Sequence, residues 1–238
     1  MNIRYIYFLL LLGVFSVGFS SACSKSKETL SITTPTPIID PIYILAGSRE
    51  AMSSVKSYQF DLSHRMGNGS KIDQSLTLVT AVGSVSRGEG ISLESELLFG
   101  NIPVSAGVIK TKKSVYLRDP LSQKWRLIRE DSNPFDFLDP DKIIASILDG
   151  LSEPNLAYSK DGFFKISGRI AASSFDYIFQ ETVNEEVDLT VWINRKSFVI
   201  TRAEISGRIS EVDPDEIIRV IEITISDEVL EIATPEIK

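Results

Sequence analysis

The sequence has little of the side-chain chemistry that many enzymes and metalloproteins use. It contains one cysteine and one histidine among 238 residues. These counts exclude a disulfide framework, a cysteine-rich zinc site and a histidine-clustered metal site. Basic residues are also in deficit, with 25 Lys and Arg against 32 Asp and Glu and a formal net charge of −7. Because nucleic-acid-binding proteins need a basic face, we expect no nucleic-acid partner.

Catalytic and cofactor-binding motifs are also scarce. Residues 23–238 contain no G-x-S-x-G sequence and no glycine-rich phosphate loop that follows a strand and opens a helix. We expect His64 to be a solvated residue at a strand end, and we expect the Asp-Pro-Asp sequences at Asp139 and Asp213 to cap a helix and form a turn. The sequence therefore predicts a protein that is not an enzyme and has no metal or cofactor. An envelope hydrolase is the weakest alternative.

The N-terminus has the pattern of an export signal. Residues 5–19 carry no charge and follow Arg4, and this run of 15 residues is shorter than the roughly 20 that a membrane-spanning helix needs. Small residues then stand directly before the only cysteine, Cys23. This arrangement predicts a lipoprotein signal peptide over residues 1–22 and a lipidated Cys23, although Ser20 stands where the lipobox usually has leucine.

Lipidation would give the chain a membrane anchor without a spanning segment, because several acyl chains on one residue bury many methylene groups. We therefore expect attachment at Cys23 to the extracytoplasmic face of a cell membrane. Residues 23–40, rich in Ser, Thr, Lys and Pro, are expected to form a flexible tether. Residues 41–238 are expected to form a single domain. The alternative is an ordinary signal peptide, with Cys23 an incidental thiol.

Two helices and a long series of strands are predicted in this domain. Asp40-Pro41 and Asp139-Pro140 each place an N-cap aspartate before a proline at the first helical position, which predicts helices to about Lys56 and to Gly150. Elsewhere, apolar and polar residues alternate with period two between short turn sequences, which indicates antiparallel strands. A last edge strand is predicted over residues 229–237. The expected fold class is α+β.

The alternating strands would present one apolar face, and too few helices are predicted to cover it completely. Either the helices leave an apolar cavity or the core is fully packed, and alternation alone leaves both open. Trp125 and Trp192 are more economically explained as core residues than as ligand contacts. If a cavity exists, the candidate lining residues taken from the alternation are Leu76, Leu78, Leu97, Val104, Val108, Val191 and Ile193.

Several short segments, in order, resemble a known family. They are residues 51–60 (AMSSVKSYQF), residues 83–85 (GSV), residues 115–117 (VYL) with Asp119-Pro120 and Trp125, and residues 189–193 (LTVWI), with Asn194 where aspartate is common. This ordered set behind a lipobox resembles the LppX/LprG (LppX_LprAFG) family of bacterial lipoproteins, from about Leu45 to Pro235.

The resemblance implies a curved antiparallel half-barrel wrapped over helices, similar to the LolA fold. It further implies a non-enzymatic protein that holds the acyl chains of a lipid or glycolipid in an apolar cavity and carries them in the cell envelope, with an envelope transporter as a possible partner. Phe135 and Phe137, before the second helix, are candidates for the cavity mouth. The alternative is a structural or signal-modulating lipoprotein with a filled core that acts through a protein partner.

Overall fold

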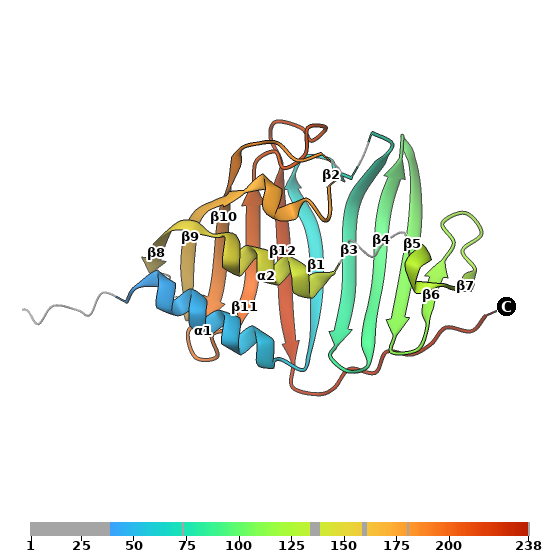
Figure 1. The fold of residues 1–238 in the computed structure, drawn as a ribbon, viewed down its shortest axis with the longest axis horizontal. Coiled ribbons are helices and arrows are strands. Elements are labelled where there is room, and N and C mark those ends of the chain that lie inside the picture. Colours follow the sequence, from blue (N-terminus) through green and yellow to red (C-terminus); the bar gives the residue numbers. More distant parts are fainter. Residues whose placement is uncertain (1–38, 73, 134–138, 159–160, 180, 238) are drawn as a thin grey trace, which may run out of the picture. The chain divides into compact units, whose positions relative to one another are not determined.

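A single antiparallel sheet dominates the computed structural model, which describes residues 39–72, 74–133, 139–158, 161–179 and 181–237. Within these residues the sheet has twelve strands (Figure 1). The strands are β1 (Ser57–Met66), β2 (Ser70–Lys71), β3 (Leu76–Ser86), β4 (Gly90–Phe99), β5 (Ile102–Thr111), β6 (Val115–Arg118), β7 (Trp125–Ile128), β8 (Ser152–Tyr158), β9 (Phe163–Ala171), β10 (Glu186–Asn194), β11 (Ile200–Ser206) and β12 (Ile218–Ser226).

The strand order is β7-β6-β5-β4-β3-β1-β12-β11-β10-β9-β8, with β2 paired to β3. β7 and β8 lie at opposite edges and do not pair, so the curved sheet stays open. Most neighbours are consecutive in sequence, but β1 pairs with β12 as well as with β3. This pairing joins the two halves of the domain. The expected α+β fold with an antiparallel sheet is confirmed.

Both predicted helices form where the Asp-Pro pairs place them. In α1 (Pro41–Ser54), the Asp40 side chain accepts a hydrogen bond from Ile42 N at 2.9 Å. In α2 (Pro140–Gly150), Asp139 accepts from the backbone N–H groups of Asp141 and Lys142. Two short 3₁₀ helices, η1 (Glu130–Ser132) and η2 (Ala172–Phe175), also occur. None of the described helices is long and apolar enough to span a membrane.

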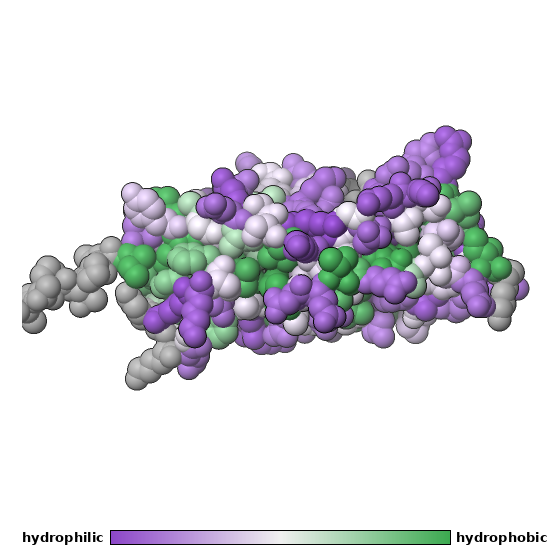
Figure 2. Space-filling model, turned by 90° about the horizontal axis from the view of Figure 1, so that it is seen from below, coloured by the Kyte–Doolittle hydropathy of each residue, from purple (hydrophilic) through white to green (hydrophobic). Residues whose placement is uncertain are grey.

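The α-helices pack on one face of the sheet, which we call the inner face; the opposite face is the outer face. In Figure 1, α1 and α2 lie in front of the half that runs from β8 to β1, and among the described residues no α-helix lies over β3–β7. The inner face carries the hydrophobic core, as in β10, where buried residues alternate with exposed or half-buried ones. Figure 2 shows the molecule from below. Hydrophobic surface runs along the middle of this side, and hydrophilic surface lies on either side of it.

Two predictions about the strands were wrong. Residues 229–237 form no strand; β12 already pairs with both β1 and β11, so it offers no free edge to the chain that follows it. The tail instead donates a hydrogen bond from Leu230 N to Ser57 Oγ at 3.1 Å. The tryptophans are not core residues either. Trp192 is half-buried on the outer face, where Lys165 and Arg202 each lie 5.2 Å from its ring centroid.

Candidate functional site

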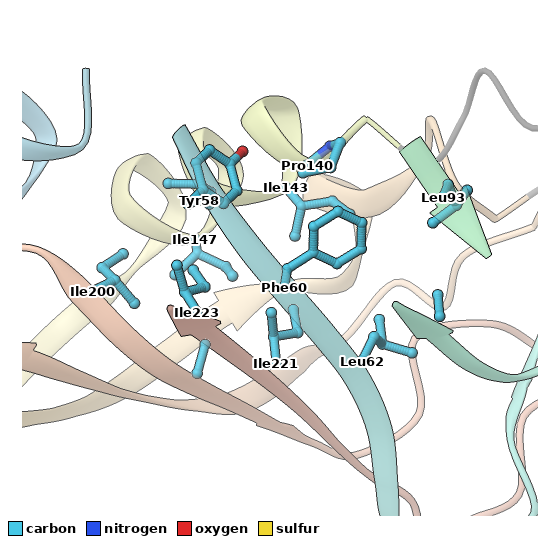
Figure 3. A pocket seen from close by; sticks show the side chains of 13 residues that line it. Tyr58, Phe60, Leu62, Leu93, Pro140, Ile143, Ile147, Ile200, Ile221 and Ile223 are labelled. Carbon is cyan, nitrogen blue, oxygen red and sulfur yellow. The ribbon is translucent and has the colours of Figure 1, made fainter. Parts of the chain in front are cut away.

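Two adjoining cavities lie between α2 and the inner face of the sheet. The first is enclosed by α2, β1, β3, β4, β11 and β12 (Figure 3), and its lining is apolar apart from the Tyr58 hydroxyl. Its lining residues are Tyr58, Phe60, Leu62, Ala81, Leu93, Pro140, Ile143, Ile144, Ile147, Ile200, Ala203, Ile221 and Ile223. This composition suits the hydrocarbon part of a ligand.

The second cavity continues the first. Leu62, Ile143 and Ile221 line both cavities, so these three side chains form the partition between them. Away from the partition, the second cavity is lined by Ser70, by Arg219 and by further hydrophobic residues, which are Ile72, Leu78, Phe175, Ile178, Phe179, Ile205 and Ile209. We call the two cavities together the apolar seam.

The apolar seam is narrow in this conformation. Each cavity leaves about 30 Å³ for the centres of water molecules, against roughly 10–15 Å³ needed for a single water. Sites for drug-sized ligands occupy about 300–1,000 Å³. The seam is therefore too narrow for an acyl chain in this conformation.

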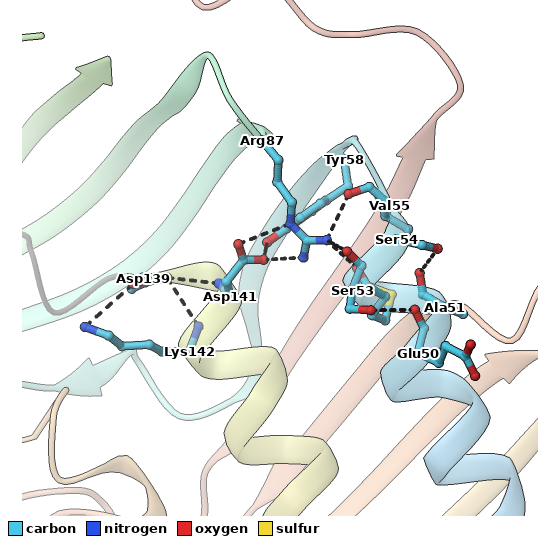
Figure 4. A network of polar contacts seen from close by, with 11 residues as sticks. Glu50, Ala51, Ser53, Ser54, Val55, Tyr58, Arg87, Asp139, Asp141 and Lys142 are labelled. Carbon is cyan, nitrogen blue, oxygen red and sulfur yellow. Dashed lines mark hydrogen bonds and ion pairs between the residues drawn. The ribbon is translucent and has the colours of Figure 1, made fainter. Parts of the chain in front are cut away.

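A polar network holds the start of α2 in place (Figure 4). The Asp141 carboxylate accepts hydrogen bonds from the Tyr58 hydroxyl and from Arg87 Nη2, both at 2.8 Å. Arg87 Nη1 donates to the carbonyl oxygens of Met52, Ser53 and Val55 at 2.6–2.9 Å, at the C-terminal end of α1. Arg87 thus satisfies carbonyls that a helix end leaves free and ties both helices to the sheet.

The same network changes the acidity of its members. Burial, reinforced by the negative charge of Asp141, raises the pKa of Tyr58 well above its usual range. The hydrogen bond to Asp141 raises the pKa of Arg87. Tyr58 therefore stays a neutral donor, and Arg87 and Asp141 form an ion pair next to Tyr58 and Pro140 of the first cavity's lining.

At the far end of the seam, a second polar cluster closes the core. Buried Arg219 forms an ion pair with buried Asp213, donates from Nε to Ser70 Oγ at 2.6 Å, and lies 5.4 Å from the ring centroid of Phe179. Asp213 also accepts from the backbone N–H groups of Ile209 and Ser210, so it does form the predicted turn. Burial lowers the pKa of Arg219 despite the adjacent carboxylate.

His64 belongs to this cluster, so the prediction of a solvated histidine was wrong. Its Nε2 lies 2.8 Å from Ser70 Oγ and its Nδ1 lies 2.8 Å from the carbonyl oxygen of Val79. The burial that comes with these contacts lowers the pKa of His64. Both ring nitrogens of His64 therefore have hydrogen-bond partners within the cluster.

The predicted lining residues are distributed across the inner face. Leu78 lines the second cavity. Four others are buried in the core without lining either cavity, and two are half-buried against it. The four are Leu97, Val108, Val191 and Ile193, and the two are Leu76 and Val104. Ligand contact at any of the seven stays a prediction. Cys23, Phe135 and Phe137 lie outside the described residues.

Sequence reasoning missed most of the seam. The alternation of Tyr58, Phe60 and Leu62 and the helical spacing of Ile143 and Ile147 are visible in the sequence. What the pattern does not give is that these two segments face each other, because the pairing of β1 with β12 and the docking of α2 depend on long-range contacts.

Comparisons with known proteins support the fold. No protein-family model matches the sequence, and no match is found among curated proteins. Among solved structures, LprF from Mycobacterium bovis matches with a TM-score of 0.60 at 18% identity, over 83% of this chain and 97% of that one. The Mycobacterium tuberculosis lipoprotein LppX matches with a TM-score of 0.52 at 14% identity, over 82% and 100%. The chain therefore has the same fold as the lipoproteins LprF and LppX, as the sequence resemblance implied.

Proposed function

We propose that this protein binds the acyl chains of a lipid or glycolipid in the apolar seam and carries them in the cell envelope. The observation that carries the proposal is the lining of the first cavity, where the only polar side-chain group is the Tyr58 hydroxyl, already hydrogen-bonded to Asp141. Moving hydrocarbon from water into such a lining is favourable by a free energy of about 25 cal/mol per Å² of apolar surface buried. The shared fold with LprF and LppX supports the same function.

Loading then requires α2 to separate from the sheet. The Arg87–Asp141 ion pair and the Tyr58 hydrogen bond oppose this movement. An acyl chain that fills the enlarged seam would replace the apolar contacts that α2 loses with the sheet. We further propose that residues 1–22 are removed, that Cys23 carries lipid, that residues 23–40 act as a tether, and that an envelope transporter exchanges the cargo. These features would place the seam close to the outer surface of a membrane.

A second candidate function keeps the core filled. The small free volume, about 30 Å³ in each cavity, favours a structural or signal-modulating lipoprotein that acts through a protein partner. The two candidates differ in one respect that can be measured, because only the first takes up hydrocarbon.

Matched alanine substitutions provide the test. Ala203 lines the first cavity, whereas Ala106 is equally buried but lines neither cavity. Ala203→Leu fills the cavity and should weaken uptake of a fluorescent fatty acid several-fold, while Ala106→Leu should leave uptake unchanged. Thermal unfolding of both variants checks that each is folded, since overpacking costs about 1–3 kcal/mol.

Native mass spectrometry of the purified, untagged protein provides the complementary readout. Co-purified lipid and fatty-acid uptake that Ala203→Leu selectively reduces support the carrier. If protein from a lipid-rich host carries no bound lipid and takes up no fatty acid, the carrier function is rejected and the filled-core function remains. Mass analysis of the N-terminal peptide, with Cys23→Ser as the control, tests the anchor separately.

A further inference from the structure

The outer face of the sheet contains a second, larger depression, which we call the polar hollow. It has a volume of about 510 Å³ and lies over β12, β1, β3 and β4. Hydroxyl, amide and carboxylate groups dominate its lining, chiefly Gln59, Asp61, Ser84, Ser92, Glu94 and Glu222. It lies on the opposite face of the sheet from the apolar seam, so one ligand cannot occupy both.

Strand register explains why the outer face is hollowed here. Glu222, Asp61, Val82 and Glu94 stand directly opposite one another on successive strands, and Thr224, Gln59, Ser84 and Ser92 form the next row. Most of the central side chains in these rows are short. Arg202 and Arg118 stand at the two ends of the first row, so long side chains border a floor of short ones.

The charge of the polar hollow is nearly balanced. Glu94 pairs with Arg118, and Glu222 pairs with Arg202 at 3.4 Å, so within the part of the chain that the structure describes the Asp61 carboxylate is the one charge of the row without an ion pair. Burial raises the pKa of Glu94. Among the described residues, no group of three or more carboxylate, histidine or cysteine side chains is arranged to hold a metal ion. The hollow is therefore better suited to a neutral ligand than to a multivalent cation.

An aromatic ring lies close to Glu94, one of the residues that line the polar hollow. Trp125 of β7 reaches back across the sheet because Gly107 of β5 has no side chain. A Cβ at Gly107 would lie 2.8 Å from Glu94 Oε1 and 3.0 Å from Trp125 Cη2, so the ring edge and the carboxylate meet above this glycine. The Arg118 guanidinium lies 5.9 Å from the Trp125 ring centroid. The half-buried indole thus stands beside a carboxylate that lines the hollow.

We propose that the polar hollow is a binding site for an uncharged carbohydrate. Ionised carboxylates only accept hydrogen bonds, so they select ligands rich in hydroxyl donors, while serine and threonine hydroxyls can also donate to ring oxygens. The indole offers an apolar surface for the C–H face of a sugar ring. Since the hollow and the seam lie on opposite faces, this site would let the protein attach to a glycan whether or not lipid is bound.

The test uses neutral trisaccharides and saturation-transfer NMR. Maltotriose, N,N′,N″-triacetylchitotriose and mannotriose are the neutral probes, and spermidine is the cationic probe. The chain has two tryptophans, so Trp192→Phe leaves Trp125 as the only indole and lets its fluorescence report ligand at the hollow. Asp61→Asn removes the uncompensated carboxylate, and Ser84→Tyr fills the floor. Asp188→Asn, at an exposed outer-face position of β10, is the matched control.

We expect at least one trisaccharide to show saturation transfer and to change Trp125 fluorescence. Asp61→Asn should weaken binding about tenfold, the value of a hydrogen bond to a charged group, and Ser84→Tyr should abolish it. Asp188→Asn should bind like the parent protein. The proposal is overturned if no trisaccharide binds, if only spermidine binds, or if Asp61→Asn and Ser84→Tyr bind as the parent does.

Discussion

The chain has a single histidine, His64, so the pH dependence of stability near pH 6.5 can be assigned to the polar cluster at the end of the apolar seam. The hydrogen-bond partners define one consistent chain, in which Arg219 Nε–H donates to Ser70 Oγ, the Ser70 hydroxyl donates to His64 Nε2, and His64 Nδ1–H donates to the Val79 carbonyl. This chain requires a neutral imidazole. Protonation would place a second donor against Ser70 and a second positive charge near Arg219.

The sign and size of the effect follow from linkage. Burial is the main cause that lowers the folded-state pKa of His64, with Arg219 adding to it, while the Val79 hydrogen bond and Asp213 oppose it. The unfolded chain, with the ordinary value of 6.5, therefore binds a proton first as the pH falls. Stability is fully present above that value and is lost below it, by at most about 1.4 kcal/mol between pH 7.5 and 5.5. Because His64 is only half-buried, water screens part of the effect and a loss of about 0.5–1 kcal/mol is expected.

Urea unfolding followed by tryptophan fluorescence at pH 7.5, 6.5 and 5.5 measures this loss. His64→Gln removes the titration while keeping a polar side chain, so its free energy of unfolding should change less over the same range. Subtracting the two curves of free energy of unfolding against pH cancels the contribution of the carboxylates that both proteins share, including Glu94. If the parent protein and His64→Gln lose stability in parallel, the pKa of His64 is not lowered and the hydrogen-bond chain is wrongly assigned.

Three further substitutions test the framework by urea unfolding. Asp213→Asn leaves the buried Arg219 charge without its partner and should cost about 3–5 kcal/mol; a loss below 1 kcal/mol would contradict the ion pair. Arg87→Met removes three hydrogen bonds to carbonyls at the C-terminal end of α1, together with the ion pair to Asp141, and should cost about 2–3 kcal/mol, whereas Arg129→Met, which breaks an exposed pair, should change little. Gly83→Ala places a Cβ 2.5 Å from the Ser92 carbonyl oxygen and should cost about 1–3 kcal/mol; unchanged stability would show that β3 and β4 can separate there.

Local chemistry accounts for what the sequence predicted correctly. The Asp-Pro pairs marked both helix starts because an N-cap and a fixed φ act within a few residues. Period-two alternation located the strands because it, too, is a signal carried by residues close together in the sequence. Residues 229–237 were misassigned because a strand also needs a free partner edge, and local pattern does not report which edges remain. Trp192 was misassigned because its neighbours Lys165 and Arg202 are distant in sequence and become adjacent only through strand register.

The candidate site could not be located in the same way, for a reason visible at Phe60 and Gly83. These residues pair across β1 and β3, and the Phe60 side chain packs against the space that a Gly83 side chain would fill. Phe60 lines the apolar seam on the inner face, while Gly83 and the backbone beside it floor the polar hollow on the outer face. Alternation assigns each residue to a face, but the position along the sheet where α2 docks depends on the pairing of β1 with β12, which brings together residues more than 150 positions apart. The predicted lining came mainly from β3–β5 and β10, whereas α2 lies over β1, β11 and β12. The missing side chain of Gly83 leaves room for Phe60 on the inner face, so a bulkier residue at position 83 should displace Phe60 and disturb fatty-acid uptake.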